Sequence, residues 1–158
     1  MPKVVLDASS LIGALLKAGS IPEQALLIAR SFWTICLSDS VEAEVRAVFA
    51  RPKFISYVAA GRGRLVLATL TAAACRYEPL ERVSDCRDMK DNKYLELALA
   101  AGASVIVSSD DDLLVLSPWR GIRILTPAMF VHEQRSDVPS GPSAGWGRDA
   151  TVDDPASS

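Results

Sequence analysis

Short apolar runs alternate with longer amphipathic stretches along most of the chain. The run KVVL at 3–6 has the β-branched character of a buried strand, and SSLIGALLKAG after it has helical spacing as far as Gly19. By the same criteria we predict further strands at 34–37, 76–80, 104–107 and 122–125. The further predicted helices are 23–32, 39–49, 88–101 and 127–132, with a helical hairpin over 54–75 that is broken at 61–63.

This alternation predicts an α/β fold, a three-layer α/β/α sandwich with a mostly parallel central sheet. Crossover helices between parallel strands cover both faces of such a sheet and bury each central strand. With 49% hydrophobic residues, the 158-residue chain has apolar material for one compact domain, which we place at residues 1–135. Residues 136–158 are rich in Ser, Gly, Pro and Asp, so we expect a disordered C-terminal tail there.

Charge and histidine content narrow the classes of function. Of the formal charge of −2, residues 136–158 carry −3, from four aspartates against one arginine, which leaves +1 for residues 1–135. A near-neutral folded part excludes a strongly basic nucleic-acid coat protein, although local patches can still hold a phosphate backbone. The single histidine, His132, argues against histidine-rich metal sites and two-histidine acid–base mechanisms. Any catalysis would therefore use carboxylates.

The cysteines and the apolar segments bear on the cellular compartment. Cys36, Cys75 and Cys86 are odd in number and form no Cys-x-x-Cys pair, so they indicate neither a disulfide framework nor a zinc site. We interpret all three as small buried apolar residues. The opening run makes a poor secretory signal, and no segment reaches the ~20 apolar residues that a membrane-spanning helix needs. We expect a soluble, cytoplasmic protein with no membrane association.

Two aspartates stand at the carboxyl ends of predicted parallel strands. Asp7 follows VVL and Asp110 follows VIVSS, and this edge is where open α/β sheets bind their ligands. A helix cap is the ordinary explanation for one such residue, because aspartate favours the turn from strand to helix. Two aspartates in equivalent places weaken that explanation.

Two further acids fall on the apolar faces of predicted helices. Glu44 lies on the apolar stripe of helix 39–49, whereas Glu42 faces outward at i,i+4 spacing from Arg46. An ionised carboxylate is costly to bury alone, so Glu44 needs either a metal or a cationic side chain such as arginine. Asp91 lies on the stripe of helix 88–101, where N-terminal capping together with Asp88 is the alternative.

These four acids together indicate a metal site. A carboxylate cluster repels itself unless cations fill it, and Mg²⁺ and Mn²⁺ prefer oxygen ligands while leaving positions open for substrate phosphate. One such ion lowers the pKa of a bound water, and a second ion about 4 Å away stabilises the leaving oxygen of an in-line displacement. The set therefore predicts phosphodiester hydrolysis without histidine.

Four motifs resemble the PIN-domain family, in particular its small prokaryotic branch of VapC-like toxin–antitoxin ribonucleases. They are VVLDASSLIGALL, EVRAVFARPKF, DMKDNKYLELALAAGASVIVSSDDDLL and GIRILTPAMF, which together span most of residues 3–131. The resemblance implies a metal-dependent endoribonuclease whose catalytic and metal-binding acids are Asp7, Glu44, Asp91 and Asp110. These are the acids selected above from strand ends and helix faces.

The resemblance also assigns supporting residues. Asp112 fits the place of an outer metal ligand, and Ser9 and Ser108 stand where the family has small polar residues near the metal. Each serine can hydrogen-bond a bound water or a neighbouring carboxylate, although turn or cap chemistry explains them equally well. We expect Asp111 to be exposed, and Ser109 stands where glycine is common in the family.

For partners, the resemblance implies RNA as substrate, a cognate antitoxin protein and a homodimer. Seven basic residues are candidates for contacts with the RNA backbone, since phosphate contacts position a nucleic acid without reading its sequence. They are Arg51, Lys53, Arg62, Arg64, Arg87, Lys90 and Lys93. The aromatic content of 6% argues against extensive base stacking.

Two other classes of function compete with the nuclease. In one, the protein is a non-catalytic PIN-like binding module that acts through dimerisation or antitoxin capture, and the four intact acids count against it. In the other, the protein is a phosphatase or receiver-like α/β domain that uses a single phosphorylated aspartate after the first strand. The dehalogenase type of phosphatase needs an aspartate where Ser9 stands, and no paired acids precede Asp7 as a receiver would require.

Overall fold

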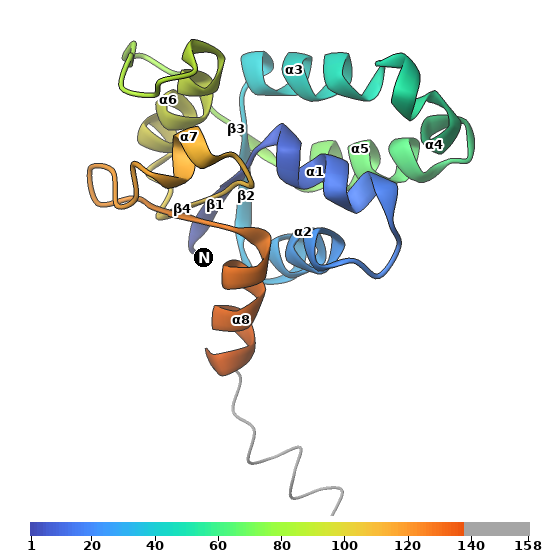
Figure 1. The fold of residues 1–158 in the computed structure, drawn as a ribbon. Coiled ribbons are helices and arrows are strands. Elements are labelled where there is room, and N and C mark those ends of the chain that lie inside the picture. The colour runs from blue at the N-terminus through green and yellow to red at the C-terminus, as the bar shows by residue number, and fades with distance from the viewer. Residues whose placement is uncertain (138–158) are drawn as a thin grey trace, which may run out of the picture.

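A computed structural model describes residues 1–137 of the chain, shown as a ribbon in Figure 1. Its centre is a five-stranded sheet in the order β3-β2-β1-β4-β5, in which each pair of neighbouring strands is parallel. The strands are β1 (Lys3–Leu6), β2 (Thr34–Leu37), β3 (Cys75–Arg76), β4 (Val105–Val107) and β5 (Arg123–Leu125).

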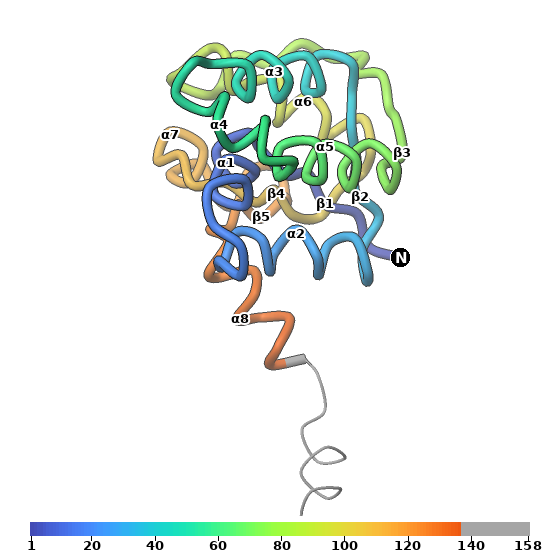
Figure 2. The backbone as a smooth tube through the Cα atoms, turned by 90° about the vertical axis from the view of Figure 1, so that its right-hand side faces the viewer, coloured from blue at the N-terminus to red at the C-terminus, as the bar shows by residue number. Residues whose placement is uncertain are grey.

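Helices cover both faces of this sheet, which confirms the three-layer α/β/α fold. They are α1 (Ala8–Leu16), α2 (Ile21–Phe32), α3 (Asp39–Phe49), α4 (Ile55–Ala59), α5 (Arg62–Ala73), α6 (Asn92–Ala101), α7 (Asp111–Leu114) and α8 (Pro127–Asp137). Two single 3-10 turns, η1 (Pro52–Phe54) and η2 (Met89–Asp91), precede α4 and α6. Figure 2 shows β1, β2 and β4 between α2 on one side and α6 on the other.

The central strands are fully buried, as a parallel sheet between two helical layers requires. Val4 and Val5 of β1 and Ile106 and Val107 of β4 have no solvent exposure. The helix α6 ends at Ala101, as predicted, and its C-cap Gly102 has the left-handed conformation at φ 71°, where a side chain would strain the backbone. The apolar runs read from the sequence therefore coincide with the core.

The structure corrects the predicted third strand, which has two residues instead of the range 76–80. The pairing of β3 with β2 ends after the hydrogen bond from the Tyr77 amide to the Leu37 carbonyl, at 2.9 Å. Pro79 follows shortly after and offers no amide hydrogen to a ladder. This edge is short, and Cys75 on it is exposed, so the prediction of a buried residue was wrong for Cys75 and right for Cys36 and Cys86.

Several helix boundaries also differ from the prediction, since α1 ends at Leu16 and not at Gly19, and α2 begins at Ile21 and not at residue 23. The helix expected over 88–101 begins with the 3-10 turn η2, because the Asp88 side chain caps the Lys90 amide, and α6 proper starts at Asn92. The last helix runs on to Asp137 instead of ending at His132. The predicted tail at 136–158 lies, from residue 138 onward, outside the described residues, so the division at residue 135 stays a prediction.

Within residues 1–137, no single helix is both long and apolar enough to cross a membrane. The pair α1 and α2, bent by 114° at its break, passes such a test on length and composition alone.

Candidate active site

The candidate site lies where the strand order changes direction. From β1, the sheet continues to β2 and β3 on one side and to β4 and β5 on the other. The crevice at the carboxyl ends of such a pair of strands is the usual ligand site of open α/β sheets. The Asp7 amide donates to the Val107 carbonyl at 3.1 Å, which keeps the two strand ends together.

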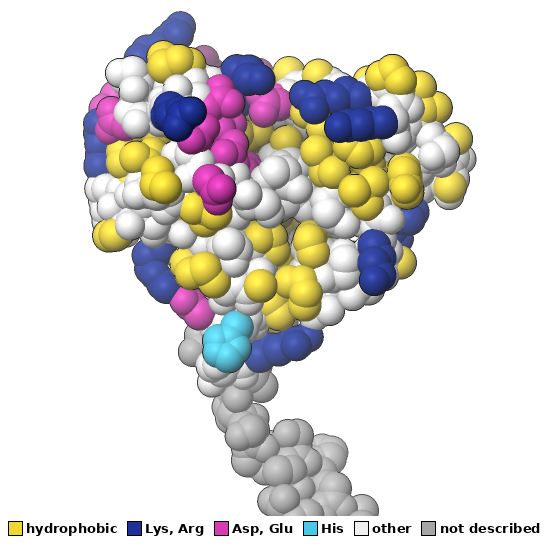
Figure 3. Space-filling view, in the orientation of Figure 1, with side chains coloured by type: hydrophobic (Ala, Val, Ile, Leu, Met, Phe, Trp, Pro, Cys, Tyr) yellow, Lys and Arg dark blue, Asp and Glu magenta, His cyan; other side chains and the backbone are white. Residues whose placement is uncertain are grey.

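A pocket of about 190 Å³ opens at this crevice. Five acids contribute to its wall, together with two basic residues and five others. The acids are Asp7, Glu44, Asp88, Asp91 and Asp110; the basic residues are Arg51 and Lys90; the others are Ala8, Ser9, Ile12, Val48 and Tyr94. All four predicted catalytic acids therefore line one pocket. In Figure 3, acidic side chains gather on the upper part of the visible face, with Lys and Arg side chains to either side.

Asp7 is held rigidly at the base of α1 and is 2% exposed. Its Oδ1 accepts hydrogen bonds from the Ser9 hydroxyl at 2.7 Å and from the Ser10 amide at 3.0 Å. Asp7 is therefore also the N-cap of α1, which was the alternative considered from the sequence. Its Oδ2 accepts from the Ser108 hydroxyl. Burial raises the pKa of Asp7 above its usual range, and the hydrogen bonds from Ser108, Ser10 and Ser9 oppose that rise.

The two predicted supporting serines join the ends of β1 and β4. Besides its bond to Asp7, the Ser108 hydroxyl accepts from the Asp110 amide at 2.9 Å. The Ser9 hydroxyl accepts from the Ser109 amide at 3.1 Å. Both serines therefore contact a carboxylate directly and also shape the turn, so the two roles considered from the sequence are combined.

Three aspartates form the tightest group in the pocket. One carboxylate oxygen each from Asp88, Asp91 and Asp110 lies within 4.8 Å of the others. Asp91 is 7% exposed, and its Oδ2 is buried without a hydrogen-bond partner among the described residues. Burial, then the adjoining Asp110 and the charges of Asp88 and Asp7, raise the pKa of Asp91 to about 8.

This group fits a hard divalent cation. A buried acceptor without a partner costs about 1–3 kcal/mol, and like charges at such spacing add to that cost. A cation bound between the carboxylates would supply the missing partner for Asp91 and offset the repulsion. Because the donor set is oxygen alone, the residues suit Mg²⁺ or Mn²⁺.

Glu44 sits apart from this group. Its side chain is 21% exposed, so it is half-buried, and it forms an ion pair with Lys93 in place of the arginine considered from the sequence. Its Oε2 also accepts a hydrogen bond from the Tyr94 hydroxyl at 3.0 Å, while that hydroxyl accepts from the Ala8 amide at 3.2 Å. Glu44 thus reaches the pocket wall with both oxygens already bound by the protein.

The sequence missed Asp88, which had been interpreted only as a cap. It does cap η2, with its Oδ1 accepting from the Lys90 amide at 3.1 Å, yet it also belongs to the aspartate group. The i,i+3 spacing of two acids before an apolar helix was the available signal. Asp112, predicted as an outer ligand, does not line the pocket; its amide donates to Asp110 Oδ1 at 2.9 Å. Asp111 is exposed, as predicted.

Only two of the seven basic candidates for RNA contacts, Arg51 and Lys90, line the pocket. Arg62 is instead occupied by the last carbonyls of α1 and by Glu23, and Lys93 by Glu44, so neither is free for phosphate. The Lys53 ammonium lies over the ring of Phe54, 5.2 Å from the ring centre. Arg64 and Arg87 are exposed elsewhere.

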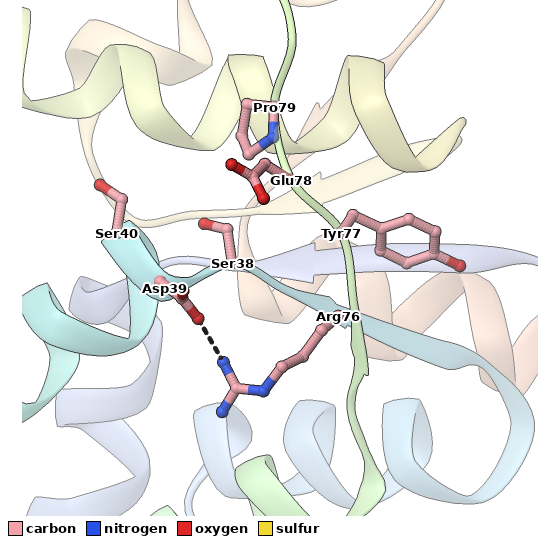
Figure 4. Close-up of a pocket in the computed structure, with 7 residues that line it drawn as sticks. All are labelled: Ser38, Asp39, Ser40, Arg76, Tyr77, Glu78 and Pro79. Carbon is pink, nitrogen blue, oxygen red and sulfur yellow. Dashed lines mark hydrogen bonds and ion pairs between the residues drawn. The ribbon is translucent and has the colours of Figure 1, made fainter.

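A larger hollow of about 490 Å³ lies at the β2–β3 edge, away from the aspartate group. Figure 4 shows its residues, with Arg76 reaching toward Asp39. Arg76 pairs there with Asp39 at 3.0 Å and with Glu42, which itself pairs with Arg46 as the sequence indicated. Because Arg76 already neutralises these acids, the smaller acidic pocket is the better candidate for metal chemistry.

Comparison with known proteins is consistent with this geometry. A family model described as PIN domain matches residues 3–112. Uncharacterized protein MJ1680 of Methanocaldococcus jannaschii is 29% identical over 143 residues, which cover 83% of this chain and 90% of that protein. The crystal structure of PAE2754 from Pyrobaculum aerophilum shares the fold at a TM-score of 0.52 and 19% identity, over 83% of this chain and 88% of that one. Because the family match covers more than half of the sequence, the chain belongs to the PIN domain family.

Proposed function

We propose that this protein is an endoribonuclease that hydrolyses RNA phosphodiester bonds with a divalent metal ion, Mg²⁺ or Mn²⁺. PIN domains are generally metal-dependent nucleases. The observation that carries the proposal is the Oδ2 of Asp91, which is buried without a partner among the described residues, on a carboxyl group that lies beside those of Asp88 and Asp110. A nuclease of this kind uses such an oxygen as a metal ligand.

In this proposal, Asp88, Asp91 and Asp110 hold the metal, and Asp7 supports it from the neighbouring strand. When bound, a metal of this class supplies a hydroxide from water and charge stabilisation for the leaving oxygen. The two serines fix the carboxylate of Asp7, so that its orientation does not depend on substrate. Glu44, held by Lys93 and Tyr94, also lines the pocket and would orient a water there, or a second cation if it exchanged its ion pair with Lys93.

The test is cleavage of a mixed RNA pool by the purified protein in Mg²⁺, Mn²⁺ or EDTA. We expect cutting with metal that falls by about 100-fold or more in Asp91→Asn and Asp7→Asn, because lost metal chemistry removes several kcal/mol of transition-state stabilisation. Asp111→Asn is the matched control, since Asp111 follows Asp110 in the sequence but is exposed and does not line the pocket. Cutting that ignores EDTA and the variants would indicate contamination, and no cutting at all would favour the non-catalytic binding module.

We extend the proposal to the toxin of a toxin–antitoxin pair that acts as a cytoplasmic homodimer, on the strength of the motif resemblance to VapC-like ribonucleases. Induced expression in bacterial cells is expected to arrest growth, and Asp91→Asn is expected to abolish the arrest. Co-expression of a small DNA-binding protein encoded beside this gene should relieve it. Growth that is unaffected by the active protein would contradict the toxin assignment and leave the nuclease assignment to the cleavage assay.

A further inference from the structure

Two basic side chains border the acidic pocket without binding to it. Arg51 and Lys90 line the same pocket as five carboxylates. Within residues 1–137, however, the side chain of neither residue forms an ion pair or donates a hydrogen bond. Several other basic side chains are paired with acids, as Arg62 is with Glu23 and Arg123 with Glu133. The two pocket cations are therefore available to an incoming anion.

Short-range backbone constraints hold both residues in place. Arg51 follows the end of α3 and has an extended backbone at φ −63° and ψ 141°. Pro52 enforces this conformation, because the ring of a proline disfavours the helical region for the residue before it. Lys90 lies inside the 3-10 turn between Asp88 and Asp91, and its amide donates to Asp88 Oδ1 at 3.1 Å. Neither position depends on a flexible loop.

The two cations come from different elements, one from the end of α3 and one from the turn before α6. A ligand that contacts both cations and the aspartate group at the same time needs several negative charges spaced along its length. The phosphates of a nucleic acid strand provide such charges. A single strand is flexible enough for one phosphate to enter the pocket and approach Asp91, which is nearly buried. A duplex is too stiff to bend into the pocket in this way.

We infer that Arg51 and Lys90 form a two-point clamp on the phosphate backbone of single-stranded RNA and place the bond to be cut over the aspartate group. The inference rests on the proposed nuclease function and names the residues that bind its substrate. The clamp contacts phosphates only, so it positions the strand without selecting a sequence. The pocket wall contains one aromatic residue, Tyr94, which is buried, so base stacking does not contribute there.

The test is binding of a short, random-sequence, fluorescein-labelled RNA pool, measured by anisotropy with Ca²⁺ in place of Mg²⁺ to fill the carboxylates. The dissociation constant is followed between about 50 and 200 mM KCl, where each phosphate contact to a single strand contributes about 0.7 to the log–log slope. Arg51→Ala and Lys90→Ala should each lower the slope by about 0.7, and the double variant by about 1.4. Arg51→Lys and Lys90→Arg should keep the wild-type slope.

Arg30→Ala and Lys17→Ala are the matched controls, because both residues are exposed and lie outside the pocket. Thermal melting confirms that each variant is folded. Wild-type slopes in both pocket variants would overturn the clamp even if Mg²⁺-dependent cleavage persists. Slopes that fall as expected would support the clamp even if cleavage is absent. The clamp and the nuclease function can therefore be contradicted independently of each other.

Discussion

At the scale of single residues, the protonation of Asp91 couples the stability of the protein to pH and to metal. The pKa of Asp91 is raised to about 8 from an unfolded value near 3.8, so the folded protein holds a proton that the unfolded chain releases. Without metal, the contribution of Asp91 to the free energy of unfolding is complete below about pH 4 and is lost as pH rises through about 8. The raised pKa of Asp7 acts in the same direction.

We therefore predict opposite pH trends with and without metal. In EDTA, the free energy of unfolding should fall between pH 5 and about 8. Since a cation must displace the proton of Asp91, its apparent affinity should rise by up to about tenfold per pH unit over this range. Urea unfolding with EDTA or Mg²⁺ measures both trends. In Asp91→Asn both should flatten, and a stabilisation by Mg²⁺ that is independent of pH in the wild type would contradict the prediction.

How far the site could be predicted depended on what fixes each side chain. Asp7 and Asp110 were found because strand ends fix their place, and Asp91 because helix periodicity does. The partner of Glu44 could not be found, since Lys93 is 49 residues away and a long side chain can reach several acids. Asp88 was missed because a capping role already explained it.

At the scale of elements, the contact of α1 with α2 depends on a glycine. A Cβ on Gly13 would lie 2.5 Å from Cγ of Pro22, whose ring cannot rotate away. Gly13→Ala should therefore lower the free energy of unfolding by about 1–2 kcal/mol, even though alanine favours the helix by about 1 kcal/mol. Urea denaturation of Gly13→Ala, Pro22→Ala and the double variant measures the coupling. Additive effects of the two substitutions would show that the clash is absent.

Elements with strong periodicity were predicted well, and those that depend on partners were not. The strands at 3–6 and 34–37 match β1 and β2, because apolar runs of that length have few other buried conformations. The edge strand β3 was overestimated, since only its neighbour decides how many residues pair. The same uncertainty made Cys75 look buried, as burial at an edge is set by the covering layer.

At the scale of the whole molecule, the alternation of strands and helices was sufficient to predict the three layers. It was not sufficient to give the order β3-β2-β1-β4-β5, because the side on which each crossover returns is a property of the assembled chain. The crevice between β1 and β4, which brings the four predicted acids to one pocket, therefore became visible only in three dimensions.

The proposed homodimer is a prediction at this scale. Large apolar side chains are exposed on α2, α4 and α5, among them Phe32, Ile55 and Leu65, and apolar surface of this kind is typical of contacts between protein chains. Sedimentation equilibrium should give twice the chain mass of 16.9 kDa at micromolar concentration. A mass of one chain across the concentration range would show that the protein acts as a monomer.

The bond between Ser108 and Asp7 joins residues 101 positions apart in the chain, and this separation has a consequence during synthesis. The ribosome releases the N-terminus first, so β1 and α1 exist long before the segment that carries Asp110. Until β4 has been made and has docked beside β1, Asp110 cannot meet Asp88 and Asp91, and every shorter translation product lacks the complete aspartate group. Under the proposed function, a cell is thereby protected from incomplete chains, and the proposed nuclease activity begins only when most of the domain has folded.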